Sequence, residues 1–338
     1  MKFIEKLRDS DFYFIAEGAD AHYGDMNRAK TMVDEAKKSG ADAIKFQHHI
    51  PEEEMLRETP MSSNMSEPLY DFLLRNALTI EQHVELAEYC ESVGIQYLCT
   101  PFSLAAAKEL EEYIDLPAYK IGSGELLDHP TIREISKFNK CMIISTGMLT
   151  PEEIDRTYEI LKNHPAGLVM MNCTSAYPPR YEDIHLKFIE EMKTRYPNAV
   201  LGFSDHSPGT ETVIASFTLG AKVMEKHVTL SHDLEGPDAT VSINFDTLGE
   251  LIVSLKRLSL AFKSKKEIHP SELEIRNWAH RSLVYLRDLK SGEVITSGDI
   301  WGKRPGYGVP SFKIDEFIGR KLVADVKKNT VLTEKDVE

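Results

Sequence analysis

The sequence is poor in cysteine and has neither a long apolar run nor a basic tract. Its 4 cysteines, Cys90, Cys99, Cys141 and Cys173, form no close pair at metal-binding spacing, and we interpret them as small core residues. No apolar run approaches the roughly 18 residues that span a membrane. The N-terminus also lacks the apolar core of a signal peptide. We therefore expect a cytoplasmic protein with no membrane partner.

Positive charge is also scarce. The 338 residues carry 54 aspartates and glutamates against 40 lysines and arginines, a formal net charge of -14. Proteins that bind nucleic acid usually concentrate basic residues on one face. This balance predicts that nucleic acid is not a partner.

The sequence does contain eight short apolar runs between residues 12 and 230, separated by segments with helical periodicity. Each run is short enough for a buried parallel strand. Their number and alternation predict an α/β fold, a (β/α)8 TIM barrel. The runs are Phe12–Ala19, Ala43–Gln47, Ile95–Phe102, Ala118–Ser123, Cys141–Thr146, Leu168–Cys173, Val200–His206 and Val223–Leu230.

Residue spacing supports helices between these runs. Apolar residues recur at three- and four-residue steps from Ala29 to Ala36, and that pattern stops at Gly40. Gly40, Gly94 and Gly220 each precede a predicted strand, where a left-handed glycine reverses the chain. Thr150 followed by Pro151 predicts a helix start after the fifth run.

The chain is longer than the roughly 250 residues that such a barrel needs. We predict a barrel over residues 1–262, a polar linker over 263–276 and a small β-rich domain over 277–338. In the small domain we expect a helix near Phe317 and strands at Ser282–Leu286, Glu293–Thr296 and Lys321–Val326.

The predicted strands end in polar residues. In TIM barrels the catalytic groups lie at the C-terminal ends of the strands, and burying so many polar groups is costly unless they hold a ligand. We therefore predict an active site at these ends. The polar residues that they supply are Glu17, Lys45, Gln47, Thr100, Lys120, Ser123, Ser145, Asn172, Asp205, His206, Glu225 and His227.

Two histidines occupy matching positions on neighbouring strands. His206 ends the seventh run and His227 lies in the eighth. One such histidine is usually structural, but adjacent strands lie about 4.8 Å apart, so two imidazoles can reach one ion. With oxygen groups nearby, the pair favours a labile octahedral ion such as Mn²⁺ over a structural zinc.

Lys45 and Lys120 allow several interpretations. A lysine on a barrel strand can form a Schiff base, bind an anion or pair with an acid. The accompanying serines Ser123, Ser145 and Ser204 favour a cradle for a phosphate and a carboxylate, with two structural ion pairs as the alternative. Glu17 is a candidate acid or base, or the partner that orients a lysine.

The order of these motifs resembles the sialic acid synthase family, of the phosphoenolpyruvate-condensing N-acetylneuraminate or N,N'-diacetyllegionaminate synthase type. The resemblance covers nearly the whole chain, including a tail similar to the family's antifreeze-like (SAF, β-clip) domain. The matching segments are residues 15–17, 45–47, 100–102, 119–125, 145–148, 173–178, 204–206, 225–227, 235–238 and 303–306.

This resemblance implies an enzyme that condenses phosphoenolpyruvate with an N-acylated mannosamine-type sugar and water, giving a nine-carbon 2-keto acid and phosphate. It implies a divalent metal on His206 and His227, Mn²⁺ first and Mg²⁺ or Co²⁺ as alternatives. Glu17 would stabilise positive charge at C2 of the phosphoenolpyruvate unit or help to deliver water, and the lysines would hold the anion.

The family's binding positions map onto this chain residue by residue. Those around phosphoenolpyruvate are Lys45, Thr100, Lys120, Ser123, Ser145 and Ser204; those around the sugar are Gln47, Asn64, Tyr177 and Asp238. Arg304 matches an arginine that in the family reaches the partner's active site in a domain-swapped homodimer.

One loop departs from the family. Where the family usually has Ile-Gly-x-Asn-His-x-Gly, this chain has Gly18 to Gly24 with Ala21 in place of the asparagine, and Asp20 and Tyr23 add new side chains. The acceptor thus remains open among N-acetylmannosamine, its 6-phosphate and the 2,4-diacetamido-trideoxy sugar that leads to legionaminic acid, although we favour an unphosphorylated one. A non-catalytic carbohydrate-binding homologue and a Schiff-base aldolase are the alternative functions.

Overall fold

The chain forms two compact units, Met1–Lys263 and Ser264–Glu338. The computed structural model describes residues 2–61, 65, 67–231 and 238–338. Within these residues no helix combines the length and apolar character needed to cross a membrane.

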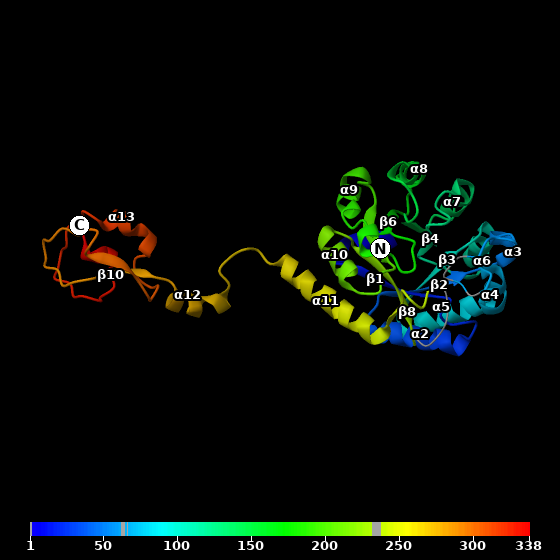
Figure 1. The fold of residues 1–338 in the computed structure, drawn as a ribbon, viewed down its shortest axis with the longest axis horizontal. Coiled ribbons are helices and arrows are strands. Elements are labelled where there is room, and N and C mark those ends of the chain that lie inside the picture. Colours follow the sequence, from blue (N-terminus) through cyan, green and yellow to red (C-terminus); the bar gives the residue numbers. More distant parts are fainter. Residues whose placement is uncertain (1, 62–64, 66, 232–237) are drawn as a thin grey trace. The chain divides into compact units, whose positions relative to one another are not determined.

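The first unit is a closed barrel of eight parallel strands, which confirms the predicted fold (Figure 1). The strands follow one another in chain order, and pairing of the first with the eighth closes the sheet. The strands are β1 Tyr13–Ala19, β2 Ala43–His48, β3 Gln96–Pro101, β4 Ala118–Ile121, β5 Cys141–Ser145, β6 Leu168–Cys173, β7 Val200–Asp205 and β8 Val223–Thr229, and a short β9 Ile243–Asn244 pairs with β8.

Helices surround these strands and cover the outer face of the sheet (Figure 1). They are α1 Phe3–Asp9, α2 Met26–Ser39, α3 Pro51–Glu54, α4 Leu69–Asn76, α5 Ile80–Val93, α6 Leu104–Tyr113, α7 His129–Ser136, α8 Pro151–Leu161, α9 Phe188–Arg195, α10 Glu211–Leu219 and α11 Phe245–Lys263, with a 3-10 turn at Tyr181–Asp183.

The predicted helix boundaries have clear physical causes. The residues after α2, α5 and α10 are Gly40, Gly94 and Gly220, with φ of 88°, 76° and 106°. This left-handed conformation suits glycine because it has no Cβ. At the start of α8 the Thr150 hydroxyl accepts a hydrogen bond from the Glu153 backbone N–H at 3.3 Å.

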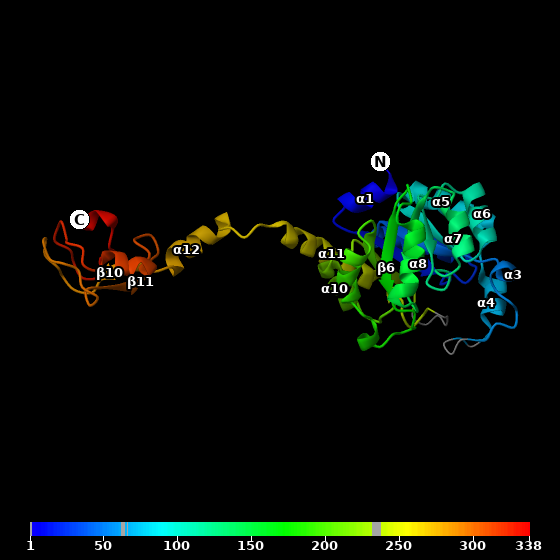
Figure 2. The ribbon, with the colours of Figure 1, turned by 90° about the horizontal axis from the view of Figure 1, so that it is seen from above.

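The barrel interior has an apolar layer at the end where the strands begin. Alternate strand residues such as Ile15, Val169 and Val223 fill it. Helix α1 buries Ile4 and Leu7 in the same cluster, and Figure 2 shows α1 at the end of the barrel opposite α4. The other end of the interior is therefore left for the polar side chains.

The second unit has less regular structure than we predicted. Its elements are α12 Leu273–Ala279, β10 Ser282–Tyr285, β11 Ile300–Lys303, α13 Ile314–Phe317 and 3-10 turns at Pro270–Glu272, Ser311–Lys313 and Glu334–Asp336. The helix near Phe317 and the strand from Ser282 are confirmed. The predictions of strands at 293–296 and 321–326 were wrong, because these segments form only isolated bridges, whereas β11 pairs with β10.

Candidate active site

A cavity of about 420 Å³ opens where the barrel strands end. The predicted site residues that line it are Glu17, Lys45, Gln47, Thr100, Lys120, Ser123, Ser145, Tyr177, Ser204, His206, His227 and Asp238. Asn64 lies outside the described residues. Arg304 belongs to the second unit, where its guanidinium lies 4.4 Å from the Trp278 ring centroid.

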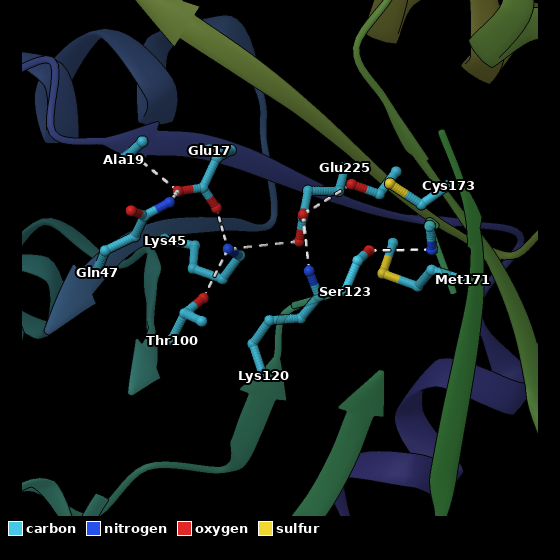
Figure 3. A network of polar contacts seen from close by, with 12 residues as sticks. Glu17, Ala19, Lys45, Gln47, Thr100, Lys120, Ser123, Met171, Cys173 and Glu225 are labelled. Carbon is cyan, nitrogen blue, oxygen red and sulfur yellow. Dashed lines mark hydrogen bonds and ion pairs between the residues drawn. The ribbon is translucent and has the colours of Figure 1, made fainter. Parts of the chain in front are cut away.

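Glu17 and Lys45 form a buried ion pair that lines this cavity (Figure 3). They are partners in the register of β1 and β2, so both side chains point inward. Lys45 Nζ also donates to Thr100 Oγ1 at 2.9 Å, and Glu17 Oε1 accepts from the Ala19 backbone N–H at 2.8 Å. Burial lowers the pKa of Lys45, but Glu17 and Glu225 raise it above its ordinary value. The amine is thus held protonated.

Glu225 connects this pair to Lys120, as Figure 3 shows. Its Oε1 accepts from Lys120 Nζ and from Ser204 Oγ, each at 3.0 Å, and its Oε2 lies 3.7 Å from Lys45 Nζ. Burial raises the pKa of this carboxyl, but the two lysines outweigh it and lower the pKa to about 2.

Our sequence-based list of site residues omitted Glu225, although we had placed it among the polar strand ends. It lies two residues before His227, and alternate residues on a strand face the same side. The two ion pairs that we gave as the alternative for the lysines are therefore present. All four charged groups line the cavity, so an anion entering it would meet both lysines.

Small polar groups surround Lys120. Ser123 Oγ accepts from the Gly147 backbone N–H at 3.0 Å, and the buried Ser145 Oγ has no hydrogen-bond partner among the described residues. A Cβ at Gly147 would lie 2.2 Å from Ser175 Oγ, so only glycine brings these groups so close. Hydroxyls beside a lysine are suited to phosphate or carboxylate oxygens.

His206 and His227 lie side by side, with ring centroids 5.1 Å apart. His206 Nδ1 is 2.8 Å from the Thr174 carbonyl, so it donates there, and Nε2, which lies 3.2 Å from the Tyr177 hydroxyl, is the nitrogen that could bind an ion. His227 Nδ1 is buried without a hydrogen-bond partner among the described residues. Burial and His206 lower the pKa of His227 well below its ordinary value, so its imidazole is neutral.

These two rings fit the metal pair that the sequence predicts. Burial lowers the pKa of His206, but Cys173 and the Thr174 carbonyl raise it to about 9. Because neutral imidazoles bind a divalent ion, metal binding would displace a proton from this ring, whereas His227 is already neutral. Asp238 contributes an oxygen 3.7 Å from His227 Nδ1, and burial with the nearby charges of Asp20 and Glu17 raises the pKa of that carboxyl to about 7. No three His, Cys, Asp or Glu side chains of the described residues gather as a ready ligand set. Metal binding stays a prediction.

The loops after β1 and β2 add two cavity residues that we did not predict. Asp20 and His49 are buried and line the cavity, with His49 Nε2 3.7 Å from Asp20 Oδ2. The loop that differs from the family sequence drew attention to Asp20, whereas no motif indicated His49. All four cysteines are free and buried as expected, but Cys173 also lines the cavity, with its sulfur 3.8 Å from His206 Nδ1.

Comparison with known proteins matches both units. Residues 32–267 match the model of the NeuB family, and residues 280–338 match the SAF domain. The chain is 31% identical to the N,N'-diacetyllegionaminic acid synthase of Campylobacter jejuni serotype O:2, covering 95% of this chain and 98% of the relative. It is 32% identical to the pseudaminic acid synthase of C. jejuni serotype O:23/36, covering 97% of each chain.

A solved structure agrees in fold. The N-acetylneuraminic acid (sialic acid) synthetase of Leptospira borgpetersenii, in complex with citrate, superposes with a TM-score of 0.71 at 27% identity. The match covers 78% of this chain and 90% of that one.

Proposed function

This chain belongs to the NeuB family, and we propose that it is a nonulosonic acid synthase. In this proposal it condenses phosphoenolpyruvate with an N-acylated mannosamine-type sugar and water, releasing phosphate. Its relatives include N,N'-diacetyllegionaminic, pseudaminic and N-acetylneuraminic acid synthases, and among their products we favour N-acetylneuraminate and N,N'-diacetyllegionaminate. The observation that carries the proposal is the buried network of Glu17, Lys45, Glu225 and Lys120 at one end of the cavity, beside the histidine pair.

The lysines bind phosphoenolpyruvate in this mechanism. Its carboxylate and phosphate take the place beside Lys45 and Lys120 that Glu17 and Glu225 partly fill in the free protein, and Ser123, Ser145 and Ser204 hydroxyls complete the cradle. Binding there would fix the orientation of the reacting C2–C3 bond.

In this mechanism Glu17 would act on the positive charge that develops when the carbon–carbon bond forms. C3 of phosphoenolpyruvate bonds to the aldehyde carbon of the open-chain sugar, which leaves positive charge at C2. The Glu17 carboxylate would stabilise that charge and accept a proton from the water that adds to C2, after which the tetrahedral intermediate expels phosphate. Because burial and Glu225 raise the pKa of Glu17 while Lys45 lowers it, its proton affinity suits an exchange with water.

The histidines would hold the metal. Mn²⁺ bound by His206 and His227 would supply a Lewis acid for the aldehyde oxygen. Tyr177, whose hydroxyl contacts His206, and Gln47 would position the sugar on the same side. Arg304 from a second subunit would close the site if the chain forms the predicted domain-swapped dimer.

A Schiff-base aldolase requires a neutral lysine, and the charge state of Lys45 argues against this function. Lys45 is held protonated by Glu17 and Glu225, and a protonated amine does not attack a carbonyl. No feature of the cavity favours the non-catalytic sugar-binding protein over the synthase.

The test is phosphate release from phosphoenolpyruvate with Mn²⁺, with and without chelator, across N-acyl mannosamine-type sugars, followed by mass spectrometry. We expect chelator-sensitive release and a product heavier than one sugar by the elements of pyruvic acid. Sugar binding without release by folded protein would instead indicate the binding protein.

Two variants separate the proposed roles. Glu17→Gln should depress kcat by about 100-fold or more, the usual scale for acid–base catalysis, with little change in phosphoenolpyruvate affinity. Lys120→Ala should mainly weaken that affinity. Glu159→Gln, a charge change on an exposed helix residue, is the matched control. Equal loss of affinity in both site variants would contradict the assignment.

A further inference from the structure

The cavity has a second charged group beyond the ends of β1, β2 and β3, which Gln47 links to the lysine network through Glu17. Asp20 follows β1, His49 follows β2, and the His49 ring stacks on Phe102 after β3, with centroids 4.2 Å apart. The three residues line the same cavity. The group is therefore built by three successive loops.

His49 is fixed from both sides of its ring. Its Nδ1 lies 3.0 Å from Glu54 Oε2, and its Nε2 lies 3.0 Å from Gln47 Oε1. Acceptors at both nitrogens require both to carry protons. Burial lowers the pKa of His49, but Asp20 and Glu54 raise it above the ordinary value, in agreement with that geometry.

This arrangement orients Gln47, a predicted sugar contact. Because His49 donates to the Gln47 amide oxygen, the amide NH₂ group points the other way, toward Glu17 Oε1 at 3.4 Å. Gln47 thus offers the cavity a donor. An acceptor for the sugar must come from another side chain.

Asp20 supplies that acceptor. It is only 6% exposed, and its Oδ1 has no hydrogen-bond partner among the described residues. Burial raises the pKa of Asp20 although His49 lowers it, so a ligand donor at Oδ1 would stabilise the ionised form. Asp20 also lies close enough to raise the pKa of Asp238, another predicted sugar contact.

The charges at this end do not suit a phosphate. Asp20, Glu125 and Asp238 line the cavity, and Glu125 Oε2 is a second buried oxygen without a hydrogen-bond partner in the described part of the chain. The lysines that line the described cavity, Lys45 and Lys120, are already bound to carboxylates in the other network. Burial raises the pKa of all three carboxyls. A phosphorylated sugar would place its charge against those that are ionised, with His49 engaged by Glu54 and Gln47.

We propose that Asp20, held beside His49, accepts a hydrogen bond from a hydroxyl or amide N–H of the acceptor sugar and makes the site selective for an unphosphorylated acceptor. This inference rests on the proposed synthase function. Asp20 stands in the loop that departs from the family sequence, so it is a specificity-determining residue of this chain, and His49 is a positioning residue.

The experiment compares wild type, Asp20→Asn and Asp20→Ala in the full-length protein with Mn²⁺. Phosphate release is measured while N-acetylmannosamine, its 6-phosphate or 2,4-diacetamido-2,4,6-trideoxymannose is varied, and again while phosphoenolpyruvate is varied. Asp115→Asn is the matched control, since the Asp115 side chain is 92% exposed and follows α6 rather than a strand end.

We expect wild type to prefer an unphosphorylated sugar. Asp20→Asn should raise the KM for that sugar about tenfold, the lower range for a charge-assisted hydrogen bond, and leave the KM for phosphoenolpyruvate within about twofold. The relative kcat/KM for the 6-phosphate should rise about tenfold, because repulsion is removed. The control should match wild type.

Several results would overturn the inference while leaving the synthase intact. They are a wild-type preference for the 6-phosphate, an unchanged sugar KM in both Asp20 variants, or an equal rise in the KM for phosphoenolpyruvate. If wild type releases no phosphate with any sugar, the proposed function fails, and calorimetric titration with N-acetylmannosamine decides separately: weaker binding by Asp20→Asn supports the contact, and equal or absent binding refutes it.

Discussion

Replacing Glu225 by glutamine should destabilise the barrel in the absence of substrate. The carboxylate is 3% exposed and accepts from Lys120 and Ser204, with Lys45 nearby. A neutral amide keeps the shape but leaves Lys120 with no carboxylate partner among the described residues. Removing one partner of a buried ion pair costs more than the pair itself contributes, because the other charge stays buried.

The shifted pKa gives the magnitude. The two lysines outweigh burial and lower the pKa of Glu225 to about 2 from an ordinary value of 4.5. At 1.36 kcal/mol per unit, this corresponds to about 3 kcal/mol. A lowered pKa stabilises the folded state above pH 4.5, and that contribution disappears as the pH falls toward 2. The measurement therefore belongs at pH 7, where the contribution is complete.

The assay is urea unfolding with two optical probes. Both tryptophans, Trp278 and Trp301, lie in the second unit, so tryptophan fluorescence follows that unit. Far-ultraviolet circular dichroism is dominated by the helical barrel. Glu225→Gln should lower the free energy of unfolding of the barrel by about 3 kcal/mol. The urea midpoint of the tryptophan fluorescence transition should not change. Adding phosphoenolpyruvate should restore stability to the variant.

Glu159→Gln is the control, because Glu159 pairs with Lys162 on the surface with 62% of its side chain exposed. Such pairs contribute at most about 1 kcal/mol. A loss in Glu225→Gln no larger than in this control would refute the argument that the carboxylate compensates buried lysines.

Three further predictions concern the barrel. Gly167→Ala should destabilise it by about 2 kcal/mol or more, because Gly167 has φ of 95° and a Cβ there would lie 2.4 Å from Ile4 Cγ1; unchanged urea unfolding would contradict the packing of α1 against it. Burial, together with His49 and Arg28, lowers the pKa of His22 to about 4. Between pH 6.5 and 4 the unfolded chain therefore binds a proton that the folded state does not bind. As the pH falls through this range, the unfolding free energy of wild type should decrease by about 1.4 kcal/mol per pH unit relative to His22→Asn. Parallel slopes of unfolding free energy against pH would exclude this. Borohydride with pyruvate should label neither Lys45 nor Lys120, and a reduced adduct found by mass spectrometry would revive the aldolase.

The barrel could be predicted from the sequence because its signals are local and repeated. Each strand–helix repeat of the barrel has a short apolar run and an apolar helix stripe, and several repeats end their helices with a glycine such as Gly40 or Gly220. The second unit lacks such repetition. Its segments at 293–296 and 321–326 pair through single bridges, and a run of β-forming residues does not distinguish a bridge from a strand.

The site was predictable where it depends on strands and unpredictable where it depends on loops. Strand alternation brings Glu17, Lys45 and His227 to one face, and register sets them side by side. His49 escaped prediction because its contacts with Glu54 and Gln47 depend on the turn into α3. The path of that turn is defined only by three-dimensional packing.

Under the proposed function, the arrangement of charge would also separate the binding sites of the two substrates. At one end two lysines are matched by two carboxylates, Glu17 and Glu225, so an anion can displace a carboxylate without leaving a lysine unpaired. At the other end Asp20 adds a buried carboxylate whose Oδ1 has no partner among the described residues. An ionised Asp20 would repel phosphoenolpyruvate there, whereas a neutral sugar could donate to it. Under the proposed function, the same asymmetry that selects the acceptor also prevents the anionic substrate from occupying the acceptor's place.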